Sequence, residues 1–203
     1  MSDTILVPGG RDVRATLDES DDGPSDAVVV ACPPHPQHGG HRGDARLVAV
    51  SDALADHGID CLRFDYGEWD DGYGERADTH NAVAWATDHY DRVGLFGFSF
   101  GGAMALLTAA DGVDVEAVSA LGPAARLASD LDVTDVFDQI HVPVQVVYGT
   151  RDDIADWRPV VDCATEYHQS TVEFAADHFF VGQTEKVATA VADFLVPNLT
   201  LDG

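Results

Sequence analysis

The segment Gly97-Phe98-Ser99-Phe100-Gly101 constrains the fold of this sequence most strongly, because it joins an apolar run to a helix-forming stretch. The apolar run covers residues 93–98, and small and helix-favouring residues follow at 102–107. A serine between a strand and a helix needs a tight, strained turn, in which flanking glycines avoid the clash that a β-carbon would make. The first turn of the helix then directs amide groups and a partial positive charge at the serine. A glycine-rich turn of this kind also occurs where it has only a packing role. Whether Ser99 is reactive must therefore be judged from other parts of the sequence.

Strands and helices alternate along the chain, which predicts an α/β fold with a mostly parallel sheet and helices on both faces. A hairpin at the start should add an antiparallel edge. The 203 residues suffice for one domain, 1–203, with a substantial core and little room for a separate lid or cap domain. Strands are expected at 4–7, 12–18, 27–31, 59–64, 93–98, 115–120, 142–148 and 171–174. Helices are expected at 44–57, 75–90, after residue 99, in a short piece through 139, at 154–168 and at 185–195.

The composition is strongly acidic, with 36 Asp and Glu against 11 Lys and Arg and a formal net charge of −25. The acidic residues recur in almost every loop rather than in a tail, and Lys186 is the only lysine. This charge argues against nucleic acid as a partner, because phosphates would meet charge of the same sign. Self-repulsion destabilises the compact state in dilute buffer, and at 1 M salt the screening length falls to about 3 Å. The composition resembles that of proteins from salt-in halophiles, so we predict stability and activity that rise with salt.

The sequence has no feature of a membrane or secreted protein. No apolar run approaches the roughly eighteen residues that span a bilayer, and the acidic N-terminus has no secretory pattern, so we expect a soluble cytoplasmic protein. The three cysteines, Cys32, Cys61 and Cys163, have no paired spacing, and a disulfide framework is not expected. Cys32 and Cys61 fall near the ends of predicted buried strands, where a small apolar thiol packs well.

Three polar residues that follow predicted strands form a candidate catalytic set: Ser99, Asp152 and His178. In a parallel sheet covered on both faces, ligands bind at the carboxyl ends of the strands. A serine becomes a strong nucleophile when an imidazole accepts its proton, and that imidazole needs a carboxylate to fix its tautomer. One loop histidine or aspartate carries little information among nine histidines and 36 acidic residues. All three in the order Ser, Asp, His, each after its own strand, predict a catalytic triad.

The chain resembles a small member of the α/β-hydrolase superfamily, near the compact dienelactone-hydrolase-like group. Three segments carry the resemblance: His35-Pro36-Gln37-His38-Gly39-Gly40, the turn at Ser99 with Phe64 to Glu75 ahead of it, and Asp177-His178-Phe179-Phe180. The resemblance covers nearly the whole chain and implies the superfamily fold and a triad of Ser99, His178 and Asp152, with Asp153 as the alternative acid. Dienelactone hydrolases proper use cysteine as the nucleophile, whereas this chain has Ser99, so the dienelactone substrate is not carried over.

Two backbone amides are candidates for an oxyanion hole, which binds the negatively charged oxygen of a tetrahedral intermediate. The N–H of Phe100 follows the nucleophile, and a second donor should come from the loop after the third strand. Pro36 has no N–H, so we assign this second donor to Gln37, with Gly39 and Gly40 allowing the loop to fold closely. Removing one such donor typically lowers turnover by about 10²–10³.

Candidate substrate-binding residues are His35, Tyr66 and Trp69, which border the same edge of the predicted sheet. The alternative for the aromatic residues of the 65–75 loop, including Tyr73, is that they pack this loop against the core. Glu75 is expected at the start of a helix, where the helix dipole favours a negative charge, rather than in a catalytic role.

The spacing of His35, His38 and His41 also raises the possibility of a metal site, because three imidazoles can gather on one ion. Spacing by threes on a glycine-rich loop does not hold a fixed ligand geometry, and this loop already has a candidate role. We therefore expect neither a metal nor another cofactor.

Taken together, these residues predict a serine hydrolase that cleaves esters or thioesters of small acyl groups, because a domain without a lid offers an open site. His178 must be neutral to accept the serine proton, so activity should fall as the pH drops through the ordinary imidazole range near 6.5. The alternative is a non-catalytic relative that uses the fold as a binding or scaffold module. The sequence does not identify the physiological substrate or the oligomeric state.

Overall fold

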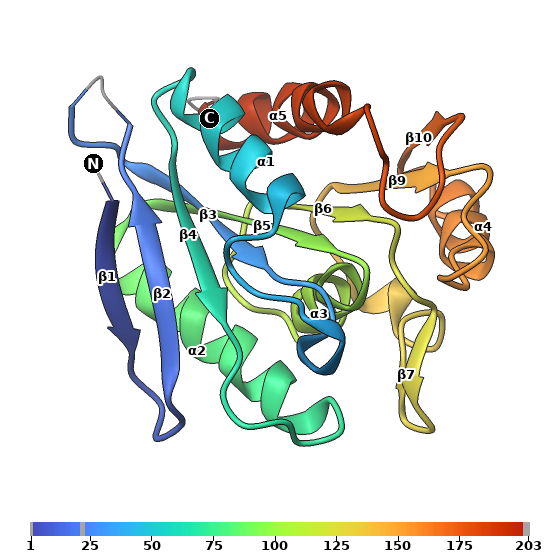
Figure 1. Ribbon diagram of the computed structural model, residues 1–203, viewed down its shortest axis with the longest axis horizontal. Coiled ribbons are helices and arrows are strands. Elements are labelled where there is room, and N and C mark those ends of the chain that lie inside the picture. Colours follow the sequence, from blue (N-terminus) through green and yellow to red (C-terminus); the bar gives the residue numbers. More distant parts are fainter. Residues whose placement is uncertain (1, 21–22, 201–203) are drawn as a thin grey trace.

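A computed structural model describes residues 2–20 and 23–200 of the chain. Its main sheet contains β1 (Ser2–Val7), β2 (Val13–Asp18), β3 (Ala27–Cys32), β4 (Asp60–Asp65), β5 (Arg92–Phe98), β6 (Ala117–Leu121), β9 (Val144–Gly149) and β10 (Ser170–Phe174). Their order across the sheet is β1-β2-β4-β3-β5-β6-β9-β10 (Figure 1). The strands from β4 to β10 pair in parallel, and β1–β2 and β2–β4 pair antiparallel. This arrangement confirms the mostly parallel sheet with an antiparallel N-terminal edge.

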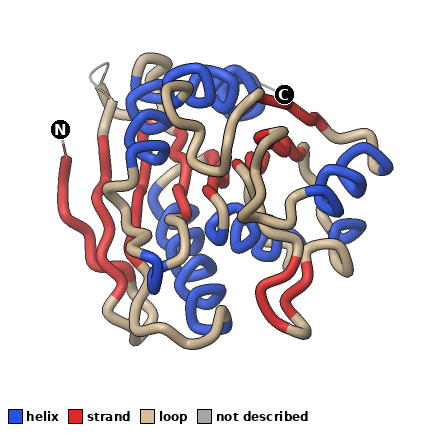
Figure 2. Tube along the Cα trace, turned by 45° about the vertical axis from the view of Figure 1, so that its right-hand side comes forward, coloured by secondary structure: helices blue, strands red, loops and turns tan. Residues whose placement is uncertain are grey.

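Helices cover both faces of the sheet (Figure 2). On one face lie α1 (Ala45–Ala55) and α5 (Thr184–Thr200), which pack against each other; on the other lie α2 (Tyr73–His89), α3 (Phe100–Ala110) and α4 (Arg158–Glu166). The connection after β6 carries a small hairpin, β7 (Arg126–Ala128) and β8 (Leu131–Asp132), and the 3-10 helix η2 (Phe137–Gln139). No cap domain is present within residues 2–20 and 23–200, as expected.

Two apolar cores lie on the two faces, and the central strands contribute alternate side chains to each. In β5, Val93 and Leu95 join the core beneath α2 and α3, whereas Phe96 and Phe98 join the core beneath α1 and α5. This explains why the central strands have continuous apolar sequences, since both of their faces are buried. Cys32 and Cys61 are buried in these cores as expected, and burial raises the pKa of the Cys61 thiol to about 12.

Most predicted elements differ from the structure by one or a few residues at their ends, and three differences are larger. The helix expected at 154–168 begins only at Arg158, because the N–H groups of Ile154 and Ala155 donate to Oδ1 of Asp152 and hold the preceding residues in a turn. The last helix does not end at 195 but continues through Pro197 to residue 200. The hairpin of β7 and β8 lies where the sequence predicts no strand, because its strands are too short to give a periodic pattern.

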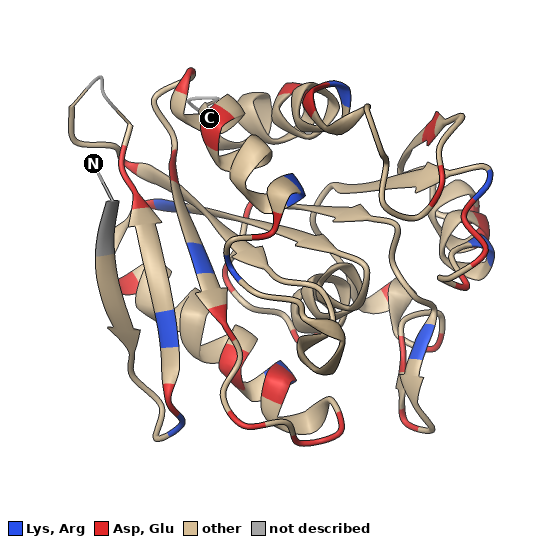
Figure 3. Ribbon diagram, in the orientation of Figure 1, with Lys and Arg blue, Asp and Glu red and all other residues tan. Residues whose placement is uncertain are grey.

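Acidic residues are spread over loops and helix surfaces around the molecule (Figure 3). Most arginines, in contrast, are engaged in ion pairs; one example is Arg63, which pairs with Asp18 across neighbouring strands. No helix in the described part of the chain is long and apolar enough to cross a membrane.

Candidate active site

Ser99 lies on a sharp turn between β5 and α3, with φ 57° and ψ −117°. The two flanking glycines are required by close backbone contacts. A β-carbon on Gly97 would lie 2.1 Å from the carbonyl oxygen of Gly101, and one on Gly101 would lie 2.2 Å from that of Cys32. The positive φ of a non-glycine residue is a strained conformation of the kind found at functional sites. The turn expected from the sequence is therefore present.

His178 connects Ser99 with Asp152. Its Nε2 lies 2.9 Å from Oγ of Ser99, and its Nδ1 lies 2.7 Å from Oδ2 of Asp152. His178 and Asp152 are each 4 % exposed. With a carboxylate on Nδ1, the favoured tautomer carries its proton on Nδ1 and leaves Nε2 to accept the proton of the serine hydroxyl.

The carboxylate of Asp152 is fixed by further hydrogen bonds. Its second oxygen, Oδ1, accepts from the N–H of Ile154 at 2.9 Å and of Ala155 at 3.0 Å. Its backbone oxygen accepts from Nε1 of Trp157 at 3.2 Å. The side chain of Asp153 is exposed. Of the two neighbouring aspartates, the structure therefore brings Asp152 to the histidine.

The three residues come from loops at the carboxyl ends of β5, β9 and β10, where the parallel sheet was expected to place them. Gly122, which follows β6, also lies at the carboxyl edge of the sheet, although no motif in the sequence identifies it. A β-carbon there would lie 3.6 Å from Oδ2 of Asp152 and 3.7 Å from the His178 ring, and its φ is +51°. The one available signal was its position directly after a buried strand.

The two candidate oxyanion donors differ in the structure. Phe100 is the first residue of α3, so its N–H has no acceptor within the helix. The N–H of Gln37 instead donates to Nδ1 of His35 at 3.3 Å, at the start of the 3-10 helix η1 (Pro36–His38). The loop does fold closely as expected, since a β-carbon on Gly40 would lie 2.1 Å from the oxygen of Pro34. Gln37 therefore lies in the loop where the second donor is expected, but its N–H donates to the side chain of His35.

The aromatic residues near Ser99 form a cluster around Phe100. The ring of His35 lies 4.4 Å from that of His38, 4.6 Å from that of Trp69 and 4.9 Å from that of Phe100. Burial, followed by the nearby His38, lowers the pKa of His35. His35 and Trp69 are only partly buried, and both therefore border the serine turn with some surface open to solvent.

Tyr66 has a different position from that expected of a substrate-binding residue. It is buried in the core, where its ring packs edge-on against Phe64 and Phe100, and its hydroxyl donates to the oxygen of Pro33 at 3.3 Å. Burial raises the pKa of this phenol well above its ordinary value. These contacts correspond to the packing alternative for this residue. Glu75 caps the start of α2 by accepting from the N–H of Gly72 at 2.8 Å, in line with the expected helix position.

The histidine-rich loop does not form a metal site. Within the described residues, no group of three or more His, Cys, Asp or Glu side chains is placed to hold a metal ion. His35 and His38 stack on each other, and Nδ1 of His41 accepts from the N–H of Gly43 at 3.0 Å.

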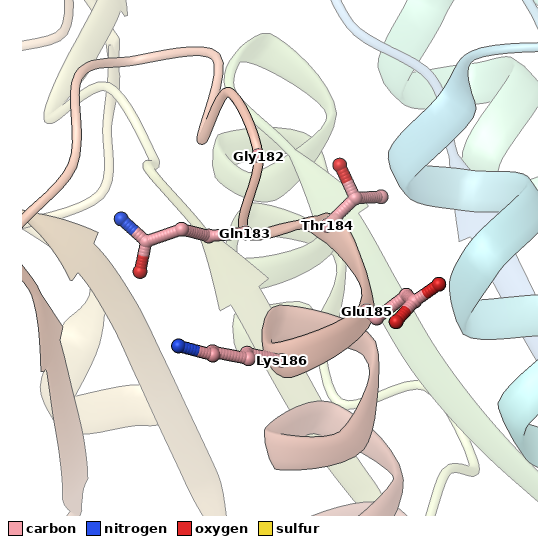
Figure 4. A pocket seen from close by; sticks show the side chains of 5 residues that line it. All are labelled: Gly182, Gln183, Thr184, Glu185 and Lys186. Carbon is pink, nitrogen blue, oxygen red and sulfur yellow. The ribbon is translucent and has the colours of Figure 1, made fainter.

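A depression of about 350 Å³ lies elsewhere, at the start of α5 (Figure 4). Gln183 and Lys186 point to one side of the helix start, and Glu185 points to the other. The depression is lined by Gly182, Gln183, Thr184, Glu185 and Lys186. Because one short stretch of chain lines it and none of the residues around Ser99 does, we treat it as separate from the candidate site.

Solved structures similar to this one include serine hydrolases, esterases and a dienelactone hydrolase. A serine hydrolase without a lid from Xanthomonas campestris is 22% identical, with a TM-score of 0.82 over 100% of this chain and 97% of that one. Est1E from Butyrivibrio proteoclasticus is 20% identical, with a TM-score of 0.84 over 98% and 99%. The dienelactone hydrolase from Anabaena variabilis is 21% identical, with a TM-score of 0.75 over 97% and 95%. At these identities the likeness establishes the α/β-hydrolase fold.

No curated protein matches the sequence significantly. The sequence model of the dienelactone hydrolase family does match, over residues 71–192, which include the serine turn and the loops that carry Asp152 and His178. This match covers more than half of the chain and agrees with the resemblance carried by its motifs. The chain therefore belongs to the dienelactone hydrolase family.

Proposed function

We propose that this protein is a serine hydrolase that cleaves carboxylic esters or thioesters of small acyl groups. The observation that carries the proposal is the hydrogen-bonded series Asp152–His178–Ser99, buried at its acidic end and placed on a strained turn at its serine end. Membership of the family supports hydrolytic activity. The hydrolase activity is assigned to the whole chain, 1–203, acting as one domain in the cytoplasm.

The proposed reaction has two halves. Oγ of Ser99 attacks the acyl carbonyl while Nε2 of His178 accepts the hydroxyl proton, and the same proton is then given to the leaving alcohol or thiol. Asp152 holds the imidazole in the required tautomer and stabilises its positive charge. The N–H of Phe100 binds the developing oxyanion. Water, activated by His178, then hydrolyses the acyl-enzyme and regenerates Ser99.

A second oxyanion donor from Gln37 requires a change in the loop. Its N–H donates to His35 at 3.3 Å, which is long for a hydrogen bond, and the side chain of His35 can rotate away only if its stacking on His38 and its contact with Trp69 are broken. We therefore assign the first donor to Phe100 and make the contribution of Gln37 dependent on substrate binding.

The substrate side of the proposal rests on the surroundings of the triad. Exposed apolar side chains lie on the loops that carry the acid and the histidine, namely Ile154, Phe179 and Val181. The rings of His35 and Trp69 lie against Phe100, which directly follows Ser99. An apolar or aromatic group on the ester fits these surroundings. Est1E, which has the same fold, has been solved with ferulic acid bound.

The alternative function, a non-catalytic binding or scaffold module, gives no reason for Ser99 to be activated. The experiment that separates the two measures hydrolysis of p-nitrophenyl acetate and p-nitrophenyl butyrate in multimolar salt, together with labelling by a fluorophosphonate probe. We expect activity and labelling in the wild type, and a loss of about a thousandfold or more in Ser99→Ala.

The matched control is Ser170→Ala, which removes an exposed serine hydroxyl at the start of β10 and should leave both readouts unchanged. If the probe labels the protein but neither ester is hydrolysed, Ser99 is activated and the enzyme has a narrower substrate range. Neither labelling nor turnover in a folded wild type would favour the binding module.

A further inference from the structure

Arg46 lies beside the proposed active site, although its charge takes no part in the reaction. It is the second residue of α1, and its guanidinium forms an ion pair with the N-cap residue of the same helix, Asp44. The Asp44 carboxylate also accepts from the backbone N–H of Arg46 at 2.9 Å. The arginine side chain is therefore held at both its backbone and its guanidinium end, and it is only 16% exposed.

The guanidinium contacts residues next to two members of the triad. Its central carbon lies 4.4 Å from the ring centroid of Phe98, which precedes Ser99. Its Nη1 donates to the backbone oxygen of Phe179, which follows His178, at 3.4 Å. The rings of both phenylalanines in turn lie against His178, at 5.2 Å for Phe98 and 5.4 Å for Phe179. Arg46 thus joins the neighbours of the nucleophile to the neighbours of the base.

In the part of the chain that the structure describes, one hydrogen-bond donor of the Arg46 guanidinium is not used. Its Nε is buried and has no hydrogen-bond partner among the described residues. A buried N–H without a partner is unfavourable and rare in native proteins. The guanidinium keeps this position because its face lies over Phe98 and its edge reaches the carbonyl of Phe179, a geometry for which a planar arginine is suited and a lysine is not.

We infer that Arg46 is a positioning residue of the active site, which fixes the loop of His178 against the turn of Ser99. This inference rests on the proposed function. Asp152 holds the imidazole only at Nδ1, and the loop that carries His178 follows the edge strand β10, which pairs with one neighbouring strand. The contacts of Arg46 connect that loop to Phe98, the residue that precedes Ser99.

The test replaces Arg46 by methionine, which keeps an unbranched apolar chain over Phe98 but removes the charge and the donor. We expect kcat to fall by about tenfold or more with KM within about twofold, since a small displacement of a catalytic group lowers the rate rather than binding. The rate of fluorophosphonate labelling should fall in parallel. Arg46→Lys, which retains a charge and one donor, should restore part of both rates.

The matched control is Arg14→Met, because Arg14 also pairs with the aspartate two residues before it, Asp12, but on the exposed surface of β2. It should leave kcat, KM and labelling unchanged. Unchanged kcat and labelling in folded Arg46→Met, or a loss confined to KM, would overturn the inference. If Arg46→Met does not fold, Arg46→Lys decides, and an unaltered labelling rate would overturn it. A wild type without Ser99-dependent labelling would instead overturn the proposed function, and this inference with it.

Discussion

Nδ1 of His178 lies 2.7 Å from Oδ2 of Asp152, whereas the side chain of the neighbouring Asp153 is exposed to solvent. The two aspartates are adjacent in sequence, so they provide a matched pair of substitutions. Asp152→Asn should lower kcat by about 10³–10⁴, because the amide no longer selects the tautomer that leaves Nε2 free. Asp153→Asn should stay within about twofold of the wild type in the same ester assay. Equal losses in the two variants would refute the assignment of the acid.

The turn at Ser99 should not tolerate a side chain at Gly101. A β-carbon there would lie 2.2 Å from a backbone oxygen of β3, and neither group can move without displacing the sheet. We expect Gly101→Ala to lower the free energy of unfolding by about 3 kcal/mol or more. Gly112→Ala is the control, since this glycine has φ +76° but no atom near its added carbon, and only about 1–2 kcal/mol is expected from the strained backbone. Denaturant unfolding measures both, and similar losses would contradict the steric argument.

Asp132 should make the stability of the hairpin region depend on pH. Burial acts to raise the pKa of this carboxyl, but hydrogen bonds from Thr134 and Arg126 outweigh burial and place the pKa below its ordinary value. The ionised form therefore stabilises the fold above the unfolded pKa, about 3.9, and this stabilisation is lost as the pH falls through the lower folded value.

Asp132→Asn should accordingly destabilise the protein by about 1–3 kcal/mol at neutral pH, with the difference narrowing towards zero in acid. Unfolding free energies measured at a series of pH values test this. Asp138→Asn, at an exposed position, should cause little change at any pH. If the difference in unfolding free energy between the wild type and Asp132→Asn stays the same below the unfolded pKa, the charge of Asp132 does not contribute and the prediction is wrong.

The acidic surface should make the protein more stable in concentrated salt. A formal charge of −25 on 203 residues gives strong self-repulsion at low ionic strength, which salt screens. We expect the melting temperature and the ester-cleaving activity to rise between about 0.1 M and 2 M KCl. Sucrose of the same osmolality is the control, because it stabilises compact states without screening charge. A maximum of stability below about 0.1 M salt would disprove this prediction.

Charge should also select among substrates. Exposed acidic residues lie on the loop before α2 and on the loops that carry the acid and the histidine, namely Glu68, Asp70, Asp71, Asp153, Asp156 and Asp177. An ester with a free carboxylate should therefore have a lower kcat/KM than a neutral ester of equal size, and the gap should close as salt is added. Comparison of p-nitrophenyl hemisuccinate with p-nitrophenyl butyrate tests this, and a preference for the hemisuccinate would contradict it.

The sequence predicts the layout of the fold and the residues of the proposed triad because both depend on local patterns. Continuous apolar runs identify the buried strands, and the carboxyl ends of parallel strands bring Ser99, Asp152 and His178 together even though 79 positions separate the first from the last. Gly97 and Gly101 are recognisable because a tight turn needs them where they stand.

Other features depend on contacts that no local pattern describes. Arg46 is an ordinary residue in the first turn of a helix, and its contact with Phe179 joins positions 133 apart. Tyr66 lies in an acidic, glycine-rich loop, and its burial follows from the position of Phe100, not from its own neighbours. The late start of α4 reflects the use of Asp152 as an acceptor, which takes two amides out of the helix.

The order of the strands has a consequence for the newly made chain. Within residues 2–20 and 23–200, β10 lies at the outer edge of the sheet, pairs with β9 alone and is followed directly by the loop of His178. A nascent chain that has folded through β6 already contains the turn of Ser99, yet neither the acid nor the base has been synthesised. The proposed triad therefore lacks both its acid and its base until the last edge strand and the loop that follows it are in place, so the activity that we propose requires the complete sheet.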